Sequence, residues 1–305
     1  MNTSISRREF LRSGGAVLAV TALTTGCVAT RNPAPVRTHG RQIQKAIMWG
    51  TVGVKGSLAE KMHAVKAAGF AGVEMMSHMN VAEVLRARDA AGLEIPSVCG
   101  ELHWKKPLTD PDPAVRAEGL EGLKQCLRDA KAYGASSVLL VPGVVNDKVA
   151  YADAYTRAQT EIRKAVPLAE KLGVKIAIEN VWNNFLLSPL EAARFVDEFR
   201  SPAVGWHFDV GNVINTGWPE QWIRVLGPRM VQLHIKEFSR TKADKEGKWA
   251  GFNVPLLEGE DNWPVVMKAV DDIGYRGWAI TEQGGGGTPE GLADLAQRLG
   301  KILAA

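Results

Sequence analysis

The chain has little cysteine, little histidine and little net charge. Of its 305 residues, three are cysteines and six are histidines, and the formal net charge is +4. Beyond Cys27, only Cys99 and Cys126 remain, which is too few for a disulfide framework, so we expect two buried apolar thiols. The small charge argues against a polyanionic partner such as nucleic acid. No Gly-x-Gly-x-x-Gly motif follows the first apolar segment, which argues against an open dinucleotide-binding sheet.

Residues 1–30 have the organisation of an export signal. The adjacent Arg7 and Arg8 precede an apolar run, 16–23, in the order typical of a twin-arginine signal peptide. This run is shorter than the about 20 residues that a membrane helix needs, so it predicts a signal and not an anchor. The segment ending in Cys27 resembles a lipoprotein processing box, which leaves lipidation open. We therefore expect recognition by the twin-arginine export machinery, and a periplasmic protein or a membrane-anchored lipoprotein facing the periplasm.

After a Pro-rich linker, 31–41, the rest of the chain is expected to form one domain, 42–305. Apolar segments of β type alternate there with amphipathic helical segments. The expected strands cover residues 43–49, 72–76, 95–99, 137–141, 175–179, 204–209, 230–234 and 278–282. Eight such units favour a single-domain (β/α)8 TIM barrel, a fold of about 250 residues.

Glycines support this interpretation, because they separate helices from the following strands. Three helices are expected at residues 57–68, 113–133 and 151–172, each ending just before a glycine. The same junction of helix, glycine and strand recurs five times, at Gly69, Gly92, Gly134, Gly173 and Gly274. Its repetition is typical of a parallel sheet.

Four polar residues lie at the ends of consecutive expected strands. Glu179, Asp209, His234 and Glu282 end strands 5, 6, 7 and 8, and the carboxyl ends of barrel strands share one mouth. Three carboxylates and one imidazole predict an oxygen-rich site for a divalent cation. We expect Mn²⁺ first, with Mg²⁺, Co²⁺ and Zn²⁺ as alternatives. Taken alone, each carboxylate could be a helix cap or an ion-pair partner, and His234 could be a polar core residue.

These motifs resemble the xylose-isomerase-like TIM barrels, in particular the sugar isomerase/epimerase group that contains ketose 3-epimerases and hydroxypyruvate isomerases. The resemblance rests on Glu179, the Asp-Val-Gly-Asn segment at Asp209, the His-x-Lys-Glu segment at His234, and Glu282. It implies that these four residues hold a divalent metal and that both glutamates act as acid and base. It also implies that Arg240 binds substrate.

The predicted constellation suits proton abstraction next to a carbonyl. A metal that stabilises the developing enediolate would let Glu179 and Glu282 remove and return a proton from different sides. Return to the same carbon gives epimerisation, return to the neighbouring carbon gives isomerisation, and loss of a leaving group gives elimination. The residues leave these three outcomes open.

Further residues are candidates for substrate binding at the same mouth. Lys236 has the same strand parity as His234, although an ion pair with Glu237 or Glu260 is the alternative. His207 has the parity of Asp209 and is expected one layer below the metal, either supporting a ligand or filling the barrel. The remaining candidates are Glu74, His103, Trp104, Trp182 and Asn212, and the tryptophans, with Trp249, could stack on a sugar or pack in loops.

Two positions depart from the ketose 3-epimerases. Phe185 stands where those enzymes carry a second glutamate, and Asn212 stands where they carry a histidine. Some hydrogen bonds to sugar hydroxyls are therefore missing, which argues against a simple ketohexose epimerase. Sugar phosphates are cytoplasmic metabolites, so an exported protein is expected to act on a free or oxidised sugar instead. 3-Keto-glycosides are the alternative substrates.

Two other functions are weighed against the isomerase. The endonuclease IV type of DNA repair enzyme uses a similar barrel but needs more histidines than Asn212 and residues 241–251 supply. A secreted sugar-binding barrel with a structural metal is the non-enzymatic alternative. Association into homo-oligomers is also open, because no surface stripe in the sequence identifies an interface.

Overall fold

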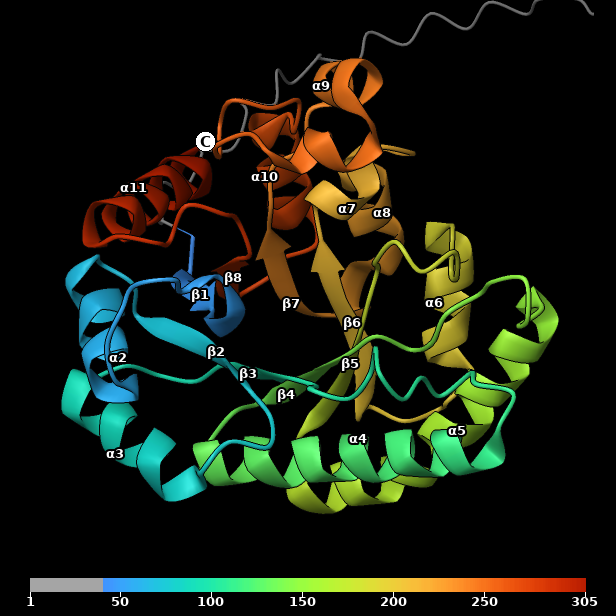
Figure 1. The fold of residues 1–305 in the computed structure, drawn as a ribbon. Coiled ribbons are helices and arrows are strands. Elements are labelled where there is room, and N and C mark those ends of the chain that lie inside the picture. The colour runs from blue at the N-terminus through green and yellow to red at the C-terminus, as the bar shows by residue number, and fades with distance from the viewer. Residues whose placement is uncertain (1–40) are drawn as a thin grey trace, which may run out of the picture. The chain divides into compact units, whose positions relative to one another are not determined.

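Residues 41–305 are described by the structure, a computed structural model. Eight parallel strands form a closed barrel in the order β1 to β8 (Figure 1). They are β1 (Ile43–Met48), β2 (Gly72–Met76), β3 (Ser97–Cys99), β4 (Ser137–Leu140), β5 (Lys175–Glu179), β6 (Val204–Asp209), β7 (Met230–Ile235) and β8 (Gly277–Thr281). The predicted (β/α)8 barrel is confirmed. The predicted signal, Cys27 and most of the linker lie outside the described residues.

The observed strands follow the predicted ones closely, with one difference at β3. This strand begins at Ser97, two residues later than predicted. Pro96 has no N–H to donate to a neighbouring strand, and it contributes only its carbonyl, which accepts from Ser136 N at 3.2 Å. The short strand therefore reflects proline chemistry. The other ends agree to within one residue.

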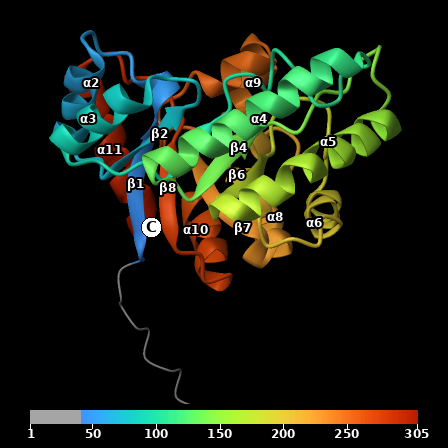
Figure 2. The same cartoon turned by 90° about the horizontal axis from the view of Figure 1, so that it is seen from below.

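Helices surround the barrel on its outside (Figure 2). They are α2 (Leu58–Ala67), α3 (Val81–Ala91), α4 (Pro113–Tyr133), α5 (Tyr151–Leu172), α6 (Pro189–Asp197), α7 (Gly211–Ile214), α8 (Pro219–Leu226), α9 (Arg240–Glu246), α10 (Trp263–Asp272) and α11 (Pro289–Ala304). Short 3-10 helices are η1 (Trp49–Thr51), η2 (Gly227–Arg229) and η3 (Lys248–Phe252). No helix within residues 41–305 is long and apolar enough to cross a membrane.

Helix ends follow from local chemistry. Ser57 and Glu60 form a reciprocal capping box at the start of α2, and Asp112 caps α4 just before Pro113. Gly134 and Gly173 end α4 and α5 at φ values of 80° and 66°, a left-handed conformation that glycine adopts without steric cost. All five predicted glycine junctions have positive φ.

The buried core of the described residues consists of one large apolar cluster and two small ones, of which one is formed by Ile214, Phe238 and Ala243. The large cluster joins strands and helices, and it contains Cys126. The other small cluster consists of Cys99, Leu139 and Val141, with Met48, Met76 and Val181 packed against it. Both thiols are buried and free, as predicted, and burial raises their pKa. The two cysteines therefore behave as apolar packing residues.

Candidate metal centre

The four strand-end residues meet in one cluster. Glu179 and Asp209 are the last residues of β5 and β6, His234 is one residue before the end of β7, and Glu282 directly follows β8. One ligand atom from each lies within 4.8 Å of the others. The predicted convergence at the carboxyl ends of the strands is therefore present in the structure.

The distances place three carboxylates around one imidazole nitrogen. His234 Nδ1 lies 3.1 Å from Glu179 Oε1, 3.5 Å from Glu282 Oε2 and 3.8 Å from Asp209 Oδ2. Asp209 Oδ2 is buried and has no hydrogen-bond partner within residues 41–305. The Lys236 ammonium, 3.2 Å away, already offsets part of the charge of this oxygen, and a divalent cation would coordinate it directly. The oxygen-rich donor set fits a hard or borderline divalent ion.

Asn180 and Asn212 hold Asp209 in place. Asn180 donates to the Asp209 carbonyl at 2.7 Å and accepts from the Asp209 N–H at 3.0 Å. Asn212 donates its backbone N–H to Asp209 Oδ1 at 2.8 Å and its amide to the Asn180 carbonyl at 2.9 Å. Asn180 was not among the predicted site residues, although it directly follows Glu179 in the sequence. These bonds leave Asp209 Oδ2 as the free oxygen of the carboxylate.

Lys236 is the cation already present at the cluster. Its Nζ lies 2.6 Å from Glu282 Oε2 and 3.2 Å from Asp209 Oδ2. The alternative ion pair with Glu237 is not formed, because Glu237 accepts from Leu257 N and Trp263 Nε1. Burial alone would lower the pKa of Lys236, but the two carboxylates raise it above its usual range.

The two glutamates have different electrostatic environments in the metal-free protein. Burial raises the pKa of Glu179 to about 7 despite the nearby His234. Burial would also raise the pKa of Glu282, but Lys236 and His234 hold it well below its usual range. Burial raises the pKa of Asp209 as well. For His234, burial opposes protonation, yet Glu74 and the other carboxylates raise its pKa well above the usual value.

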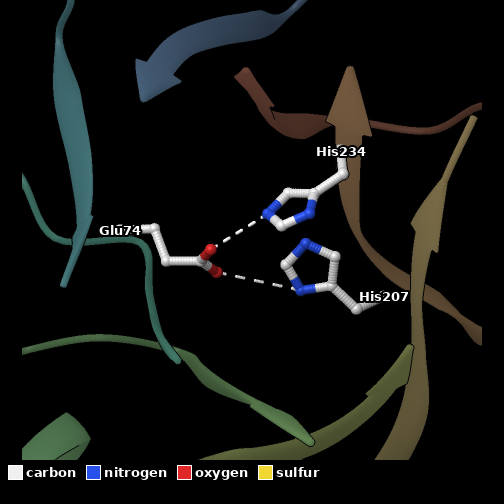
Figure 3. A group of neighbouring side chains, drawn as sticks. All are labelled: Glu74, His207 and His234. Atoms are coloured by element: carbon white, nitrogen blue, oxygen red, sulfur yellow. Dashed lines mark hydrogen bonds and ion pairs between the residues drawn. The ribbon is translucent and has the colours of Figure 1, made fainter. Parts of the chain in front are cut away.

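Glu74 and His207 lie inside the barrel beside His234 (Figure 3). Glu74 Oε2 lies 2.9 Å from His234 Nε2, and Glu74 Oε1 lies 3.9 Å from His207 Nδ1. Both side chains are completely buried, so neither is open to a substrate. For Glu74 this corrects the predicted position at the mouth. For His207 it agrees with the expected layer below the ligands.

A cavity of about 390 Å³ opens above the cluster and contains most of the other candidates. Its lining residues include Trp104, Glu179, Trp182, Asn212, Lys236, Trp249, Phe252, Glu282 and Gln283. The Trp182 ring centroid lies 4.7 Å from that of Trp249 and 4.8 Å from that of Phe252. Trp104 and Trp249 are 50% and 66% exposed, so aromatic faces are available at the mouth. Gln283 and Phe252 were not among the predicted site residues.

Arg240 and His103 have partners elsewhere. Arg240 donates from Nε to the Ile214 carbonyl at 2.6 Å and from Nη2 to the Gly217 carbonyl at 2.8 Å. It therefore supports the α7 segment in this structure, and it does not line the cavity. His103 is buried and accepts from Val141 N at 3.3 Å, and burial lowers its pKa to about 4. Neither geometry brings the side chain to a substrate.

Phe185 stands where ketose 3-epimerases carry a second glutamate. It is buried against aromatic residues, with its ring centroid 5.4 Å from Tyr151 and 5.8 Å from Phe195. The position at which those enzymes carry a glutamate therefore belongs here to an apolar cluster, and it supplies no hydrogen bond to a sugar.

The closed parallel barrel, with a polar cluster at the carboxyl ends of its strands, identifies the protein as a TIM barrel. The family described as xylose isomerase-like TIM barrel matches residues 62–302, and the chain belongs to that family. The resemblance expected from the four strand-end motifs is confirmed.

Relatives in this family include sugar epimerases. The chain is 24% identical over 254 residues to the L-ribulose-5-phosphate 3-epimerase of Escherichia coli K12. The aligned region covers 78% of this chain and 86% of that protein.

Solved structures share the fold at lower sequence identity. D-allulose 3-epimerase from a Methylomonas species, in complex with D-allulose, superposes with a TM-score of 0.68 at 17% identity, covering 86% of this chain and 97% of that one. The 3-keto-D-glucoside 4-epimerase of E. coli superposes with a TM-score of 0.73 at 14% identity, covering 86% and 100%.

Proposed function

We propose that this protein is a divalent-metal-dependent sugar isomerase or epimerase that moves a proton on a carbon next to a carbonyl. One observation carries the proposal. Glu179 and Glu282 come from different strands, belong to the same four-residue cluster and both line the cavity at the mouth. Two carboxylates at one cavity are the groups that proton removal and return require. The epimerases among the relatives support the same chemistry.

The residues of this chain have distinct roles in the proposal. A divalent cation held by Glu179, Asp209, His234 and Glu282 would supply Lewis-acid polarisation of the substrate carbonyl. Glu179 and Glu282 flank the cavity, so one removes the proton and the other returns it. Asp209 and His234 are too deeply buried to reach a substrate carbon and serve as anchors.

Lys236 is proposed to contact a substrate oxygen. It lines the cavity and is the single basic side chain among the described residues that do so. Its ammonium already neutralises Asp209 and Glu282 at 3.2 Å and 2.6 Å. A phosphate would have to compete with two carboxylates for this one cation. The lining therefore favours a free or oxidised sugar over a sugar phosphate, in contrast to the substrate that the E. coli relative's name states.

A 3-keto-glycoside is the second candidate substrate, and the aromatic mouth favours it. Trp104 and Trp249 present exposed indole faces beside the two glutamates. Aromatic faces stack on the apolar faces of sugar rings and of aromatic aglycones, so the mouth suits a substrate that extends beyond one ring. On such a substrate the same glutamates support epimerisation or expulsion of the aglycone. The structural likeness to the 3-keto-D-glucoside 4-epimerase agrees with this choice.

Solvent deuterium uptake tests the proposal. Metal-free and Mn²⁺-loaded protein would be incubated in D₂O with free ketoses, the matching ketose phosphates and 3-keto-glycosides, and the products read by NMR and mass spectrometry. We expect Mn²⁺-dependent incorporation of deuterium next to the carbonyl for unphosphorylated substrates. Binding of these sugars without any deuterium uptake would instead support the non-catalytic sugar-binding barrel. Faster turnover of the phosphates would overturn the substrate assignment.

We also propose that Mn²⁺ is the physiological ion and that residues 1–30 direct export through the twin-arginine pathway. That pathway carries folded proteins, so the metal could be acquired in the cytoplasm. Replacing both Arg7 and Arg8 by Lys should retain the protein in the cytoplasm, as cell fractionation would show. Metal analysis of the protein purified from its own periplasm identifies the ion, and mass spectrometry of its N-terminus shows whether Cys27 is lipidated.

A further inference from the structure

Glu74 lies on β2, yet it reaches across the barrel to a residue of β7. Its Oε2 is 2.9 Å from Nε2 of His234, and both side chains are fully buried (Figure 3). At this distance Nε2 can donate its hydrogen to the carboxylate. Glu74 Oε1 has no hydrogen-bond partner within residues 41–305, so the bond to His234 is the one that holds this carboxylate.

The bond to Glu74 determines which nitrogen of the imidazole is available to a metal ion. His234 has Nε2 directed to Glu74 and Nδ1 directed to Glu179, Asp209 and Glu282. A neutral histidine that carries its hydrogen on Nε2 has its lone pair on Nδ1. A carboxylate that accepts from the distal nitrogen fixes this tautomer and makes the other nitrogen a better ligand.

His207 packs against the same imidazole without a hydrogen bond. The two ring centroids are 4.1 Å apart at an interplanar angle of 72°. Neither nitrogen of His207 has a hydrogen-bond partner within the described part of the chain, since Glu74 Oε1 is 3.9 Å from Nδ1, and burial lowers the pKa of His207 well below the usual value. His207 therefore limits the orientation of the His234 ring by contact, while Glu74 provides the hydrogen bond.

We propose that Glu74 is a positioning residue of the metal centre, which accepts the Nε2 hydrogen of His234 and directs Nδ1 toward the cation. This inference rests on the metal site of the proposed function, but not on its sugar chemistry. Glu74 touches neither the cavity nor the three carboxylates that share the cation. Its contribution is to metal affinity, through the geometry and tautomer of one ligand.

The Glu74→Gln variant tests this role, because glutamine keeps the size of the side chain and removes the charge-assisted acceptor. Ser97→Ala is the matched control, since Ser97 is also fully buried in a barrel strand and its hydroxyl has no hydrogen-bond partner within residues 41–305. Mn²⁺ affinity of the chelator-treated proteins would be measured by calorimetry and by electron paramagnetic resonance of free Mn²⁺. We expect Glu74→Gln to bind about 10- to 100-fold more weakly, and Ser97→Ala to bind like the wild type. A folded Glu74→Gln protein with wild-type affinity would overturn the proposal.

A measurement on the wild type covers the case in which the variant does not fold. In protein with ¹⁵N-labelled histidine and bound diamagnetic Mg²⁺ or Zn²⁺, the ring whose Nδ1 resonance responds to metal identifies His234. We expect its Nε2 to carry a hydrogen that exchanges slowly with solvent. An unprotonated Nε2 would overturn the proposal. If metal binds as expected and deuterium uptake is absent, the proposed function fails while the role of Glu74 stands.

Discussion

The two sides of the barrel mouth differ sharply in chemistry. The polar side is the end of strands β5 to β8, with Glu179, Asp209, His234 and Glu282. The apolar side is the cluster of Cys99, Leu139 and Val141 with Met48, Met76 and Val181, and all but Val181 belong to the first four strands and the residues that follow them. Burial disfavours the charged form of a carboxylate, and it raises the pKa of Glu179 to about 7.

Glu74 is the exception that links the two sides. It belongs to β2, in the half of the chain that forms the apolar side, but its carboxylate contacts His234 on the polar side. The difference between the sides therefore concerns what each does. The polar side holds the four residues proposed to bind a cation, and Glu74 of β2 contributes a hydrogen bond to one of them.

The largest predicted effect comes from removing a proton-transfer group on the polar side. Glu179→Gln and Glu282→Gln should each lower metal-saturated turnover by about 10²- to 10⁴-fold, because an amide cannot exchange a proton with carbon. Deuterium uptake at saturating Mn²⁺ measures this. Glu101→Gln is the control, since Glu101 pairs on the surface with Lys105. Turnover within a few-fold of wild type in either glutamine variant would remove that glutamate from the mechanism.

Metal affinity should respond next most strongly. Asp209→Asn removes a fully buried carboxylate whose Oδ2 accepts no hydrogen bond within residues 41–305 and lies 3.2 Å from Lys236 Nζ, so Mn²⁺ binding should weaken at least about tenfold. In the wild type, Mn²⁺ at 100 times its Kd should add about 2.7 kcal/mol to the free energy of unfolding. Under the same conditions the variant should gain much less. Thermal unfolding with and without Mn²⁺ reports both values, and an equal gain in the variant would exclude Asp209 as a ligand.

The pH should change metal affinity in one direction. In the metal-free protein the pKa of His234 is raised well above its usual value, and burial raises that of Glu179 to about 7. A cation must displace these protons, so affinity should rise with pH by about tenfold per unit for each proton released. The rise should be steepest below pH 7, where both groups hold protons, and shallower above it. Calorimetry in buffers of different ionisation enthalpy counts the protons, and a pH-independent Kd would contradict this.

The apolar side should show the opposite behaviour. Leu139→Ala creates a cavity in a buried cluster, so it should lower the free energy of unfolding of the metal-free protein by about 2–5 kcal/mol. Mn²⁺ affinity should stay within about twofold of the wild type, because Leu139 contacts no ligand. Urea unfolding and calorimetry provide the two values. A large loss of metal affinity in this variant would show that the two sides are not separable.

The fold and the convergence of the four strand-end residues could be predicted because their signals are local. Periodicity, the glycine junctions and a polar residue at the end of each apolar strand are visible along the chain. The depth of a residue inside the barrel is not visible along the chain. Strand parity indicates that Glu74 points inward, but the stagger between strands decides that it meets His234 below the mouth. Arg240 could not be placed either, since its carbonyl partners lie 26 and 23 residues away in sequence.

The most direct test of the central claim is anomalous X-ray diffraction from crystals of the protein loaded with Mn²⁺. We expect one strong anomalous peak on the polar side of the mouth, coordinated by Glu179, Asp209, His234 Nδ1 and Glu282, with Glu74 still bound to His234 Nε2. A peak elsewhere, or no peak in protein that other measurements show to be folded, would contradict it.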